Sequence, residues 1–412
     1  MSEQKKLLPK LRFPEFREAE GWEEKPLGEF MTESRMPGSK GNVAKKITVK
    51  LWGNGVFEKN DAIQGSINTQ YFRRKAGQFI YSKLDFLNQA FGIIPTSLDD
   101  FESTVDLPCF DFADGLNPVF LLEYVKRKDF YEKLGETADG SRKARRIHAE
   151  TFLSFPIALP SPVEQQKITD CLSSLDELIA AQARKVDALK AHKRGLMQQL
   201  FPGEGETQPS LRFPEFQDAE KWENRTIGDM FSLINGCAFK PEDWKPNGTP
   251  IIRIQNLNDP SAEFNYSQAP VSERNRVESG DLLFAWSGTL GSSFGARVWT
   301  GPPGVLNQHI FKVLMDEQRI TLPFALLVLA RVEEDIAEKS HGFKASFVHV
   351  KKSDLVKVEL PLPALHEQQR IAACLSSLDA LITAATQELD TLKTHKKGLM
   401  QQLFPSAEAV EA

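Results

Sequence analysis

Two stretches of the chain carry the same long pattern of apolar residues, which recur at steps of three and four. The stretches cover residues 164–202 and 367–405, and 26 of the 39 aligned positions hold the same residue. Such spacing puts apolar side chains on one stripe of an α-helix, and about five heptads of it are typical of a coiled coil. In the first copy the stripe consists of Ile168, Leu172, Leu175, Ile179, Val186, Leu189, Leu196 and Leu200.

Polar residues interrupt this stripe at three positions. They are Gln182, Lys193 and Lys396. Polar groups inside an apolar seam fix the register of paired helices at some cost in stability. We therefore expect these three side chains to lie between two helices.

The predicted ends of the long helices carry recognisable signals. Ser161, Pro162 and Glu164 match an N-cap, a first-turn proline and a capping-box partner, whereas Ala364 replaces the serine in the second copy. Pro202 and Pro405 end the helices. At about 1.5 Å per residue, each helix is roughly 55 Å long.

Each long helix needs a partner for its apolar stripe. The similar stripe within the chain belongs to the other copy, and this favours an antiparallel pair that acts as a rigid spacer. The stripe alone leaves open an ordinary coiled coil that serves oligomerisation.

The repeat extends beyond the helices. The string LRFPEF at 11–16 returns at 211–216, and Trp22 and Gly28 match Trp222 and Gly228. The offset is 200 residues here and 203 at the helices, so the intervening segments differ by three residues. A repeated frame thus encloses two dissimilar inserts, each of about one domain in size.

Both inserts read as mixed α/β, with many short strands. Strands are predicted at 78–81, 92–95, 250–254, 281–286 and 310–314, and helices at 118–133 and 322–340. The predicted segments are residues 1–158, 159–204, 205–360 and 361–412, with the two helices in the second and fourth. A flexible junction is expected at 202–209.

Composition narrows the class of protein. The chain has 412 residues and a formal net charge of −5, which argues against indiscriminate coating of nucleic acid. Neither a secretion signal nor an apolar run that could span a membrane is visible, so a cytoplasmic protein is expected. The four cysteines fit free thiols in a reducing compartment.

Motifs of the common enzyme classes are missing from the sequence. It has no G-x-x-x-x-G-K-[ST] phosphate loop, and its seven histidines show no metal-ligand spacing. We therefore expect no catalytic residues, no metal site and no cofactor bound by this chain.

Basic residues gather instead in loops of the two inserts. Arginine and lysine bond phosphates, and arginine and asparagine can also bond base edges. The alternative is an ordinary solvated charged surface. The candidate DNA-binding residues are Arg73, Arg74, Lys83, Arg142, Lys143, Arg145, Arg146, Arg253, Asn256, Arg274, Lys344 and Ser346.

The frame resembles the specificity subunit of type I restriction-modification enzymes. The resemblance rests on LRFPEF, on Glu-Gln-Gln at the two helix starts, and on KRGLMQQLFP and KKGLMQQLFP at the helix ends. Within the second insert, GDLLF at 280–284, Ser287-Gly288 and Asn307-Gln308-His309 resemble strings of the family's target-recognition domains. The first insert has GQFIYSK at 77–83 in place of a Gly-Asp string, which indicates a different subfamily.

The resemblance implies a non-catalytic protein of mixed α+β fold. Two target-recognition domains would each read one half of a bipartite site in double-stranded DNA, separated by a pair of antiparallel coiled-coil helices with a pseudo-twofold internal repeat. Two methyltransferase subunits would bring S-adenosylmethionine, and restriction subunits would add translocation with ATP and Mg²⁺.

Two other functions compete with this one. A stand-alone DNA methyltransferase would need the cofactor and catalytic motifs that the sequence lacks. A structural coiled-coil adaptor without DNA affinity would not need the basic loops.

Overall fold

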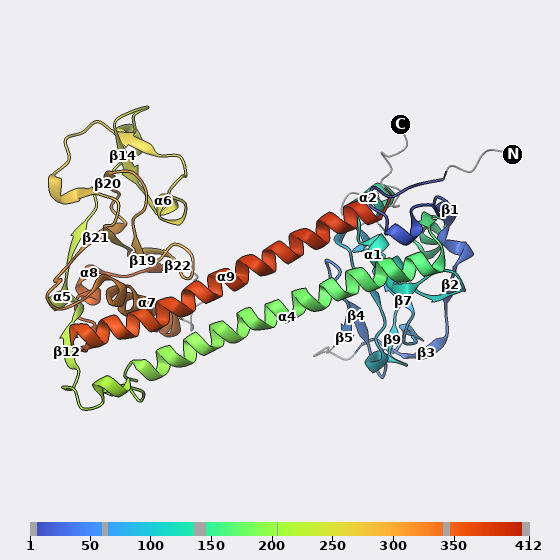
Figure 1. Cartoon of the computed structure of the whole chain (residues 1–412), viewed down its shortest axis with the longest axis horizontal. Coiled ribbons are helices and arrows are strands. Elements are labelled where there is room, and N and C mark those ends of the chain that lie inside the picture. Colours follow the sequence, from blue (N-terminus) through green and yellow to red (C-terminus); the bar gives the residue numbers. More distant parts are fainter. Residues whose placement is uncertain (1–5, 60–64, 136–145, 204, 341–346, 406–412) are drawn as a thin grey trace. The chain divides into compact units, whose positions relative to one another are not determined.

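The computed structural model describes residues 6–59, 65–135, 146–203, 205–340 and 347–405. The chain divides into two compact units. Unit 1 comprises Met1–Arg184 and Thr386–Ala412, and unit 2 comprises Lys185–Ala385. The helices α4 (Pro162–Leu200) and α9 (Leu365–Leu403), green and red in Figure 1, each contribute residues to both units. Each unit therefore holds one insert with the parts of both helices that belong to it.

The two long helices run antiparallel in unit 1. Lys396 Nζ of α9 lies 2.7 Å from Asp176 Oδ2 of α4, and Gln182 Nε2 donates to Glu388 Oε2 at 2.8 Å. Residue numbers rise along α4 as they fall along α9, which confirms the predicted antiparallel direction. Among the seam residues of this unit, Ile168, Leu172, Leu175 and Leu389 are buried.

Unit 2 repeats this arrangement. Lys193 Nζ of α4 lies 2.6 Å from Asp379 Oδ1 of α9. Asp379 and Lys396 follow Asp176 and Lys193 by 203 residues, so the two ion pairs are equivalent under the internal repeat. All three polar interruptions of the seam thus bond across the helix pair, as predicted.

A buried ion pair, rather than a full capping box, marks the start of each long helix. Ser161 Oγ accepts from the Glu164 backbone N–H at 3.3 Å, so the predicted N-cap is present. The predicted return bond from the Glu164 carboxylate is wrong, because that group accepts from Arg12 Nε and Nη2, each at 2.7 Å. In unit 2 the equivalent Glu367 accepts from Arg212 at 2.8 and 2.7 Å.

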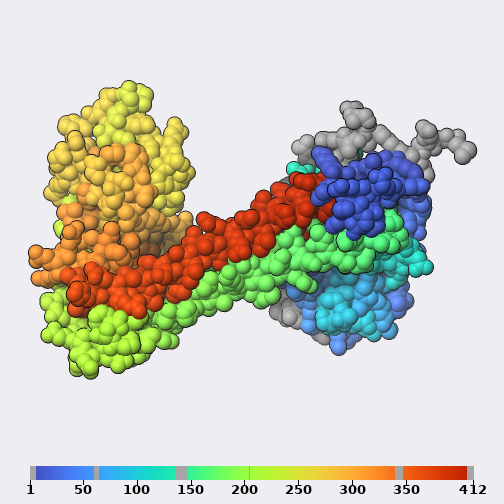
Figure 2. Space-filling model, viewed as in Figure 1, coloured from blue at the N-terminus to red at the C-terminus, as the bar shows by residue number. Residues whose placement is uncertain are grey.

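Aromatic rings pack together at the helix ends in each unit. In unit 1, Phe404 lies 6.1 Å from Trp22 and 5.3 Å from Phe120, measured between ring centroids. Leu11 N donates to Gln402 O at 2.9 Å, and Figure 2 shows the blue N-terminal segment against the red end of α9. The second copy of this string, LRFPEF at 211–216, follows α4 closely in the chain.

Unit 2 has the same joint made from its own residues. Phe201 lies 6.1 Å from Trp222 and 5.5 Å from Phe324. Leu211 N donates to Gln199 O at 2.9 Å. The repeated part of the sequence therefore forms, in each unit, the same packing contact between a domain and the ends of the two long helices.

The insert of unit 1 is built on a four-stranded antiparallel sheet of order β2-β10-β7-β8. Smaller sheets pair β1 with β11, β4 with β5, and β3 and β9 with β6. The strands are β1 (Glu23–Pro26), β2 (Met31–Ser34), β3 (Pro37–Lys40), β4 (Ile47–Val49), β5 (Val56–Glu58), β6 (Gln70–Arg73), β7 (Phe79–Tyr81), β8 (Phe91–Ile93), β9 (Glu102–Ser103), β10 (Cys109–Phe112) and β11 (Pro156–Leu159). The helices of this insert are α1 (Pro118–Val125), α2 (Lys128–Gly135) and α3 (Ala149–Leu153).

The insert of unit 2 has a four-stranded sheet of order β13-β21-β17-β19, also antiparallel. A second sheet has the order β15-β14-β20-β16, and β12 pairs with β23 and β18 with β22. The strands are β12 (Glu223–Thr226), β13 (Phe231–Asn235), β14 (Thr249–Ile252), β15 (Asn265–Ser267), β16 (Arg276–Val277), β17 (Leu282–Ala285), β18 (Ser287–Thr289), β19 (Gly295–Val298), β20 (Gly304–Leu306), β21 (Ile310–Met315), β22 (Phe347–His349) and β23 (Glu359–Leu362). The helices are α5 (Ile227–Met230), α6 (Ile254–Asn258), α7 (Leu322–Ser340) and α8 (Lys352–Leu355).

The two dissimilar inserts share one sheet order. In each, the first strand of the sheet in chain order pairs with the last, the last pairs with one middle strand, and that strand pairs with the other middle strand at the far edge. The predicted helix at 322–340 is confirmed as α7, whereas the single helix predicted at 118–133 is wrong, because α1 ends at Val125 and α2 begins at Lys128. Between them, Arg127 turns to donate Nη2 to Pro405 O at 2.7 Å.

Candidate nucleic-acid interface

Five of the predicted DNA-binding residues lie outside the described residues. They are Arg142, Lys143, Arg145, Lys344 and Ser346. The described residues beside these segments are Arg146 in unit 1 and Phe347 in unit 2, and both are exposed.

Arg74 is a structural residue, and its prediction as a DNA contact is wrong. Its side chain is 2% exposed. Its guanidinium donates to Ser34 O at 2.7 Å, Ser103 Oγ at 2.8 Å and Leu107 O at 3.2 Å. These bonds tie β6 to β2, to β9 and to the loop before β10, so the group cannot also reach a duplex.

Asn256 is likewise unavailable to DNA. It is fully buried in α6. Its Oδ1 accepts from Arg253 N at 3.0 Å, and its Nδ2 donates to Ala262 O at 3.2 Å. Both ends of the amide are used to hold the turn in place, which corrects the second of the predictions.

The other predicted residues reach the surface to different extents. Arg73 on β6 and Arg274 in the 3-10 helix Glu273–Asn275 are exposed. Arg253 is half-buried over Trp244, 5.0 Å from the ring centroid, and donates Nη1 to Asn265 Oδ1 at 2.8 Å. Only part of its guanidinium therefore remains open to a ligand.

Lys83 and Arg146 are brought together by the fold. Ile147 N donates to Lys83 O at 3.1 Å, which places the two cationic residues on adjacent backbone segments. Arg146 Nη1 lies 3.9 Å from Asp106 Oδ1, a contact between half-exposed side chains that solvent weakens. The pair forms the described edge of the predicted basic loop at 141–148.

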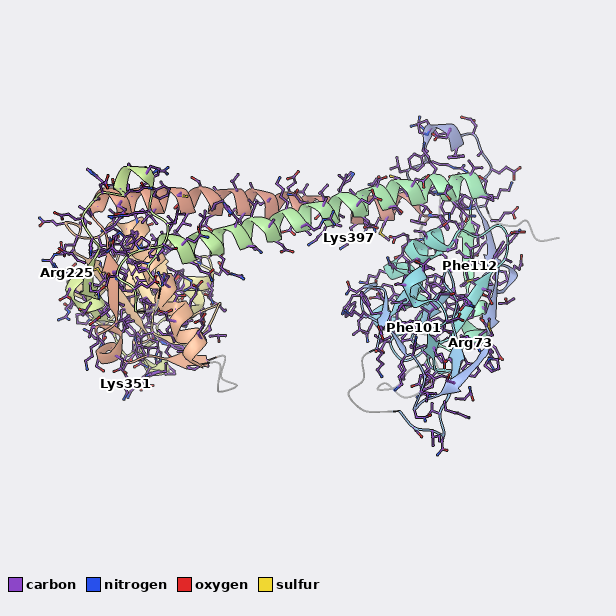
Figure 3. The ribbon with its side chains drawn as sticks, turned by 90° about the horizontal axis from the view of Figure 1, so that it is seen from below. Arg73, Phe101, Phe112, Arg225, Lys351 and Lys397 are labelled. Carbon is purple, nitrogen blue, oxygen red and sulfur yellow. The ribbon has the colours of Figure 1, made fainter. Side chains whose placement is uncertain are left out.

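A basic, aromatic surface in unit 1 was missed by the sequence analysis. It surrounds the hairpin of β4 and β5 and includes three lysines placed over rings: Lys45 over Phe101, Lys46 over Tyr71 and Lys50 over Phe57. Arg73 adjoins it, since Arg74 N donates to Phe101 O, and Figure 3 shows Arg73 and Phe101 near each other. The signal was available, because residues 34–57 contain five lysines and arginines and no acid.

In unit 2, strings that lie far apart in the sequence meet around Trp286. The ring of His349 at the end of β22 lies 4.6 Å from the indole, and that of His309 lies 5.4 Å away. Trp286 N donates to His309 O at 3.2 Å, and Val350 N donates to Trp286 O at 3.0 Å. Ser287 pairs with His349 in the β18–β22 ladder.

The outer part of this Trp286 cluster is polar and reachable. Gln308 and His349 are exposed, and Gln308 Nε2 lies 3.3 Å from His309 Nε2. Amide and imidazole groups can bond base edges in a groove. The segments 282–315 and 347–353 that build the cluster contain no acid, which favours an anionic ligand.

Other kinds of site find little support in the described part of the chain. No group of three or more His, Cys, Asp or Glu residues there could hold a metal ion. The four cysteines are free, as predicted, and burial raises the pKa of the Cys109 thiol to about 12. Within the described ranges, no helix combines the length and the apolar character that crossing a membrane requires.

Comparison with known proteins gives one consistent family. The family model for the type I restriction modification DNA specificity domain matches residues 219–394. The chain is 23% identical over 304 residues to the type I restriction enzyme MjaVIII specificity subunit of Methanocaldococcus jannaschii, covering 70% of each protein. It is 25% identical over 298 residues to the putative MjaX specificity subunit of the same organism, covering 69% of this chain and 66% of the relative.

Solved structures share the fold at low sequence identity. The type I restriction-modification S subunit from M. genitalium aligns with a TM-score of 0.55 and 16% identity, over 97% of this chain and 99% of that one. A chain from a study of complex assembly and conformational transition of the type I system aligns with a TM-score of 0.60 and 17% identity, over 93% and 98%. The chain thus carries a type I restriction modification DNA specificity domain at residues 219–394 and is similar over about two thirds of its length to type I specificity subunits.

Proposed function

We propose that this chain gives a type I restriction-modification complex its DNA sequence specificity, with each unit reading one half of a bipartite target. The observation that supports this proposal is that the two units share one architecture but expose different side chains. Both units have one sheet order and one joint to the helix ends, yet unit 1 exposes lysines over rings and unit 2 exposes the Trp286 cluster. Two reading surfaces of different chemistry suit two different half-sites.

The helix pair would set the distance between the half-sites. Interhelical bonds at Lys396–Asp176, Gln182–Glu388 and Lys193–Asp379 fix the register of the pair in each unit. A fixed register supports a fixed number of unspecified base pairs between the two halves.

The remaining parts of the reaction would come from partners. We assign adenine methylation to two methyltransferase subunits that bind S-adenosylmethionine, and translocation and cleavage to restriction subunits that use ATP and Mg²⁺. This chain would act in the cytoplasm, bind none of these cofactors, and place double-stranded DNA for its partners. The family resemblance supports this division of labour.

Mapping of methylated adenines tests the proposal. Cells that express this chain with its methyltransferase partner should carry methylated adenines in one bipartite motif with a spacer of constant length. Deletion of this chain alone should abolish the methylation. A continuous motif, or methylation that survives the deletion, would contradict the proposal.

A further inference from the structure

Trp52 occupies an unusual position in unit 1. It lies in the loop Lys50–Gly55 between β4 and β5, with a backbone φ of +60° and a side chain that is 62% exposed. The other five tryptophans of the chain are buried or half-buried. A large ring is thus presented to solvent by a residue whose backbone is in the left-handed region.

The backbone conformation is strained, and the surrounding loops hold it. Bulky residues rarely adopt left-handed φ values, and such strain concentrates at functional sites. Trp52 N donates to Asn88 O at 2.7 Å, and Gly53 N donates to Gln89 O at 2.9 Å. Gln89 is itself left-handed, with a φ of +53°, so two tight turns fix the direction of the indole.

The ring contributes little to the core. Its chain neighbour Leu51 is 38% exposed, and Phe57 across the hairpin is 43% exposed. A glycine would suit the backbone at this position better than any other residue. The presence of a tryptophan at such a position therefore points to a role outside the fold.

The charge around the hairpin is positive. Lys50 Nζ lies 4.0 Å from the centroid of the Phe57 ring, and the run 34–57 has no acid. Among the nearby carboxylates, Asp85 accepts from Ser82 and Asn88, Glu123 pairs with Lys126, and Glu58 is exposed at the end of β5.

We propose that Trp52 is an aromatic contact to duplex DNA, with its indole packed against bases or sugars in a groove and Lys50 bonding a neighbouring phosphate. Apolar wedges and stacking rings act in this way where they are flanked by cations. The assignment rests on the proposed function and names a contact of the first half-site.

Substitution by glycine separates this role from a structural one. Because glycine tolerates the left-handed backbone, Trp52→Gly should keep or raise the thermal midpoint of the full chain. Its affinity for a labelled duplex carrying the mapped target should nevertheless fall about tenfold or more. Trp52→Phe should recover much of the affinity, and Val119→Ala, which truncates an exposed apolar residue on α1, should change neither quantity.

Salt dependence distinguishes the two contacts. Trp52→Gly removes no charge and should leave the slope of log affinity against log salt unchanged, whereas Lys50→Ala should reduce it by about one.

Three results would overturn the assignment. Unchanged affinity of Trp52→Gly would show that the ring does not touch DNA, and loss of affinity together with a lower midpoint would show a structural role. Normal DNA affinity with lost binding of the methyltransferase subunit would assign the surface to a protein. If the wild-type chain, alone and with its partner, binds no duplex selectively, the proposed function fails instead.

Discussion

Lys396 of α9 and Asp176 of α4 form an ion pair across the two long helices, with Nζ 2.7 Å from Oδ2. Lys193 and Asp379 form the equivalent pair in unit 2 at 2.6 Å. The two pairs differ in one neighbour, because Lys396 also lies 3.1 Å from Glu123, whose carboxylate is 5% exposed. The ion pair of unit 1 is therefore coupled to the buried carboxylate of Glu123, whereas the equivalent pair of unit 2 is exposed.

Replacement of the two lysines should have unequal effects. Lys396→Met leaves the buried carboxylate of Glu123 with Lys126 alone and should lower the free energy of unfolding by about 3 kcal/mol. The matched Lys193→Met breaks a pair in which Asp379 is half-exposed and should cost about 0–1 kcal/mol. Urea unfolding of the full chain measures both, and equal losses would show that Glu123 is not a factor.

The same cluster gives unit 1 a pH dependence. Burial raises the pKa of Glu123, but attraction to Lys126 and Lys396 outweighs burial and holds the pKa below its usual value of 4.5. Burial lowers the pKa of Lys396, but Glu123 and Asp176 outweigh it and hold the pKa above 10.5. An acid whose pKa is lowered by folding, such as Glu123, stabilises the fold at pH values above its own unfolded-state pKa. A base whose pKa is raised by folding, such as Lys396, stabilises the fold at pH values below its own unfolded-state pKa.

The contribution of the cluster should therefore be complete between about pH 4.5 and 10.5 and should disappear outside this range. Unfolding midpoints measured from neutral to acidic pH should fall less steeply for Glu123→Gln than for the wild type. Parallel curves for the two proteins would mean that other carboxylates cause the loss of stability at acidic pH.

Two adjacent arginines offer a matched test of fold against binding. Arg74→Ala leaves buried carbonyl groups without donors and should cost about 2–4 kcal/mol of stability. Arg73→Ala removes an exposed side chain and should change stability by less than about 0.5 kcal/mol. If Arg73 bonds a phosphate, its loss should lower the salt slope of DNA affinity by about one, and an unchanged slope would remove it from the interface.

The length of the helix pair should set the spacer of the target. Four residues inserted into each helix, near Gln182 and near Glu388, add one turn and lengthen the pair by about 6 Å. At about 3.4 Å per base pair, the preferred spacer should grow by one or two base pairs while both half-sites stay the same. Active protein with the original spacer would show that another element sets the distance.

What could be predicted from the sequence was governed by local periodicity. The heptad stripe, its polar interruptions and α7 depend on residues a few positions apart, and all are present in the structure. The capping box failed because Glu164 bonds Arg12, 152 positions away, and no local rule contains such a partner.

The candidate site depended on burial and on distant contacts. Arg73 and Arg74 look alike in the sequence, yet Arg73 is exposed at the end of β6 and Arg74, the next residue, is buried. The Trp286 cluster joins three strings that only the sheet brings together. Trp52 was hidden because its backbone conformation is not a property of the local pattern.

If each unit reads its own half-site within a shared frame, an exchange of inserts should change the DNA target in a defined way. Glu23 pairs with Leu159 in the β1–β11 ladder as Glu223 pairs with Leu362 in β12–β23, so residues 223–362 can be replaced by a second copy of residues 23–159 at equivalent positions. Methylated adenines mapped in cells carrying this chimera should lie in a target with two copies of the first half-site and the original spacer. An active chimera that still methylates the wild-type target would show that the inserts do not determine the half-sites.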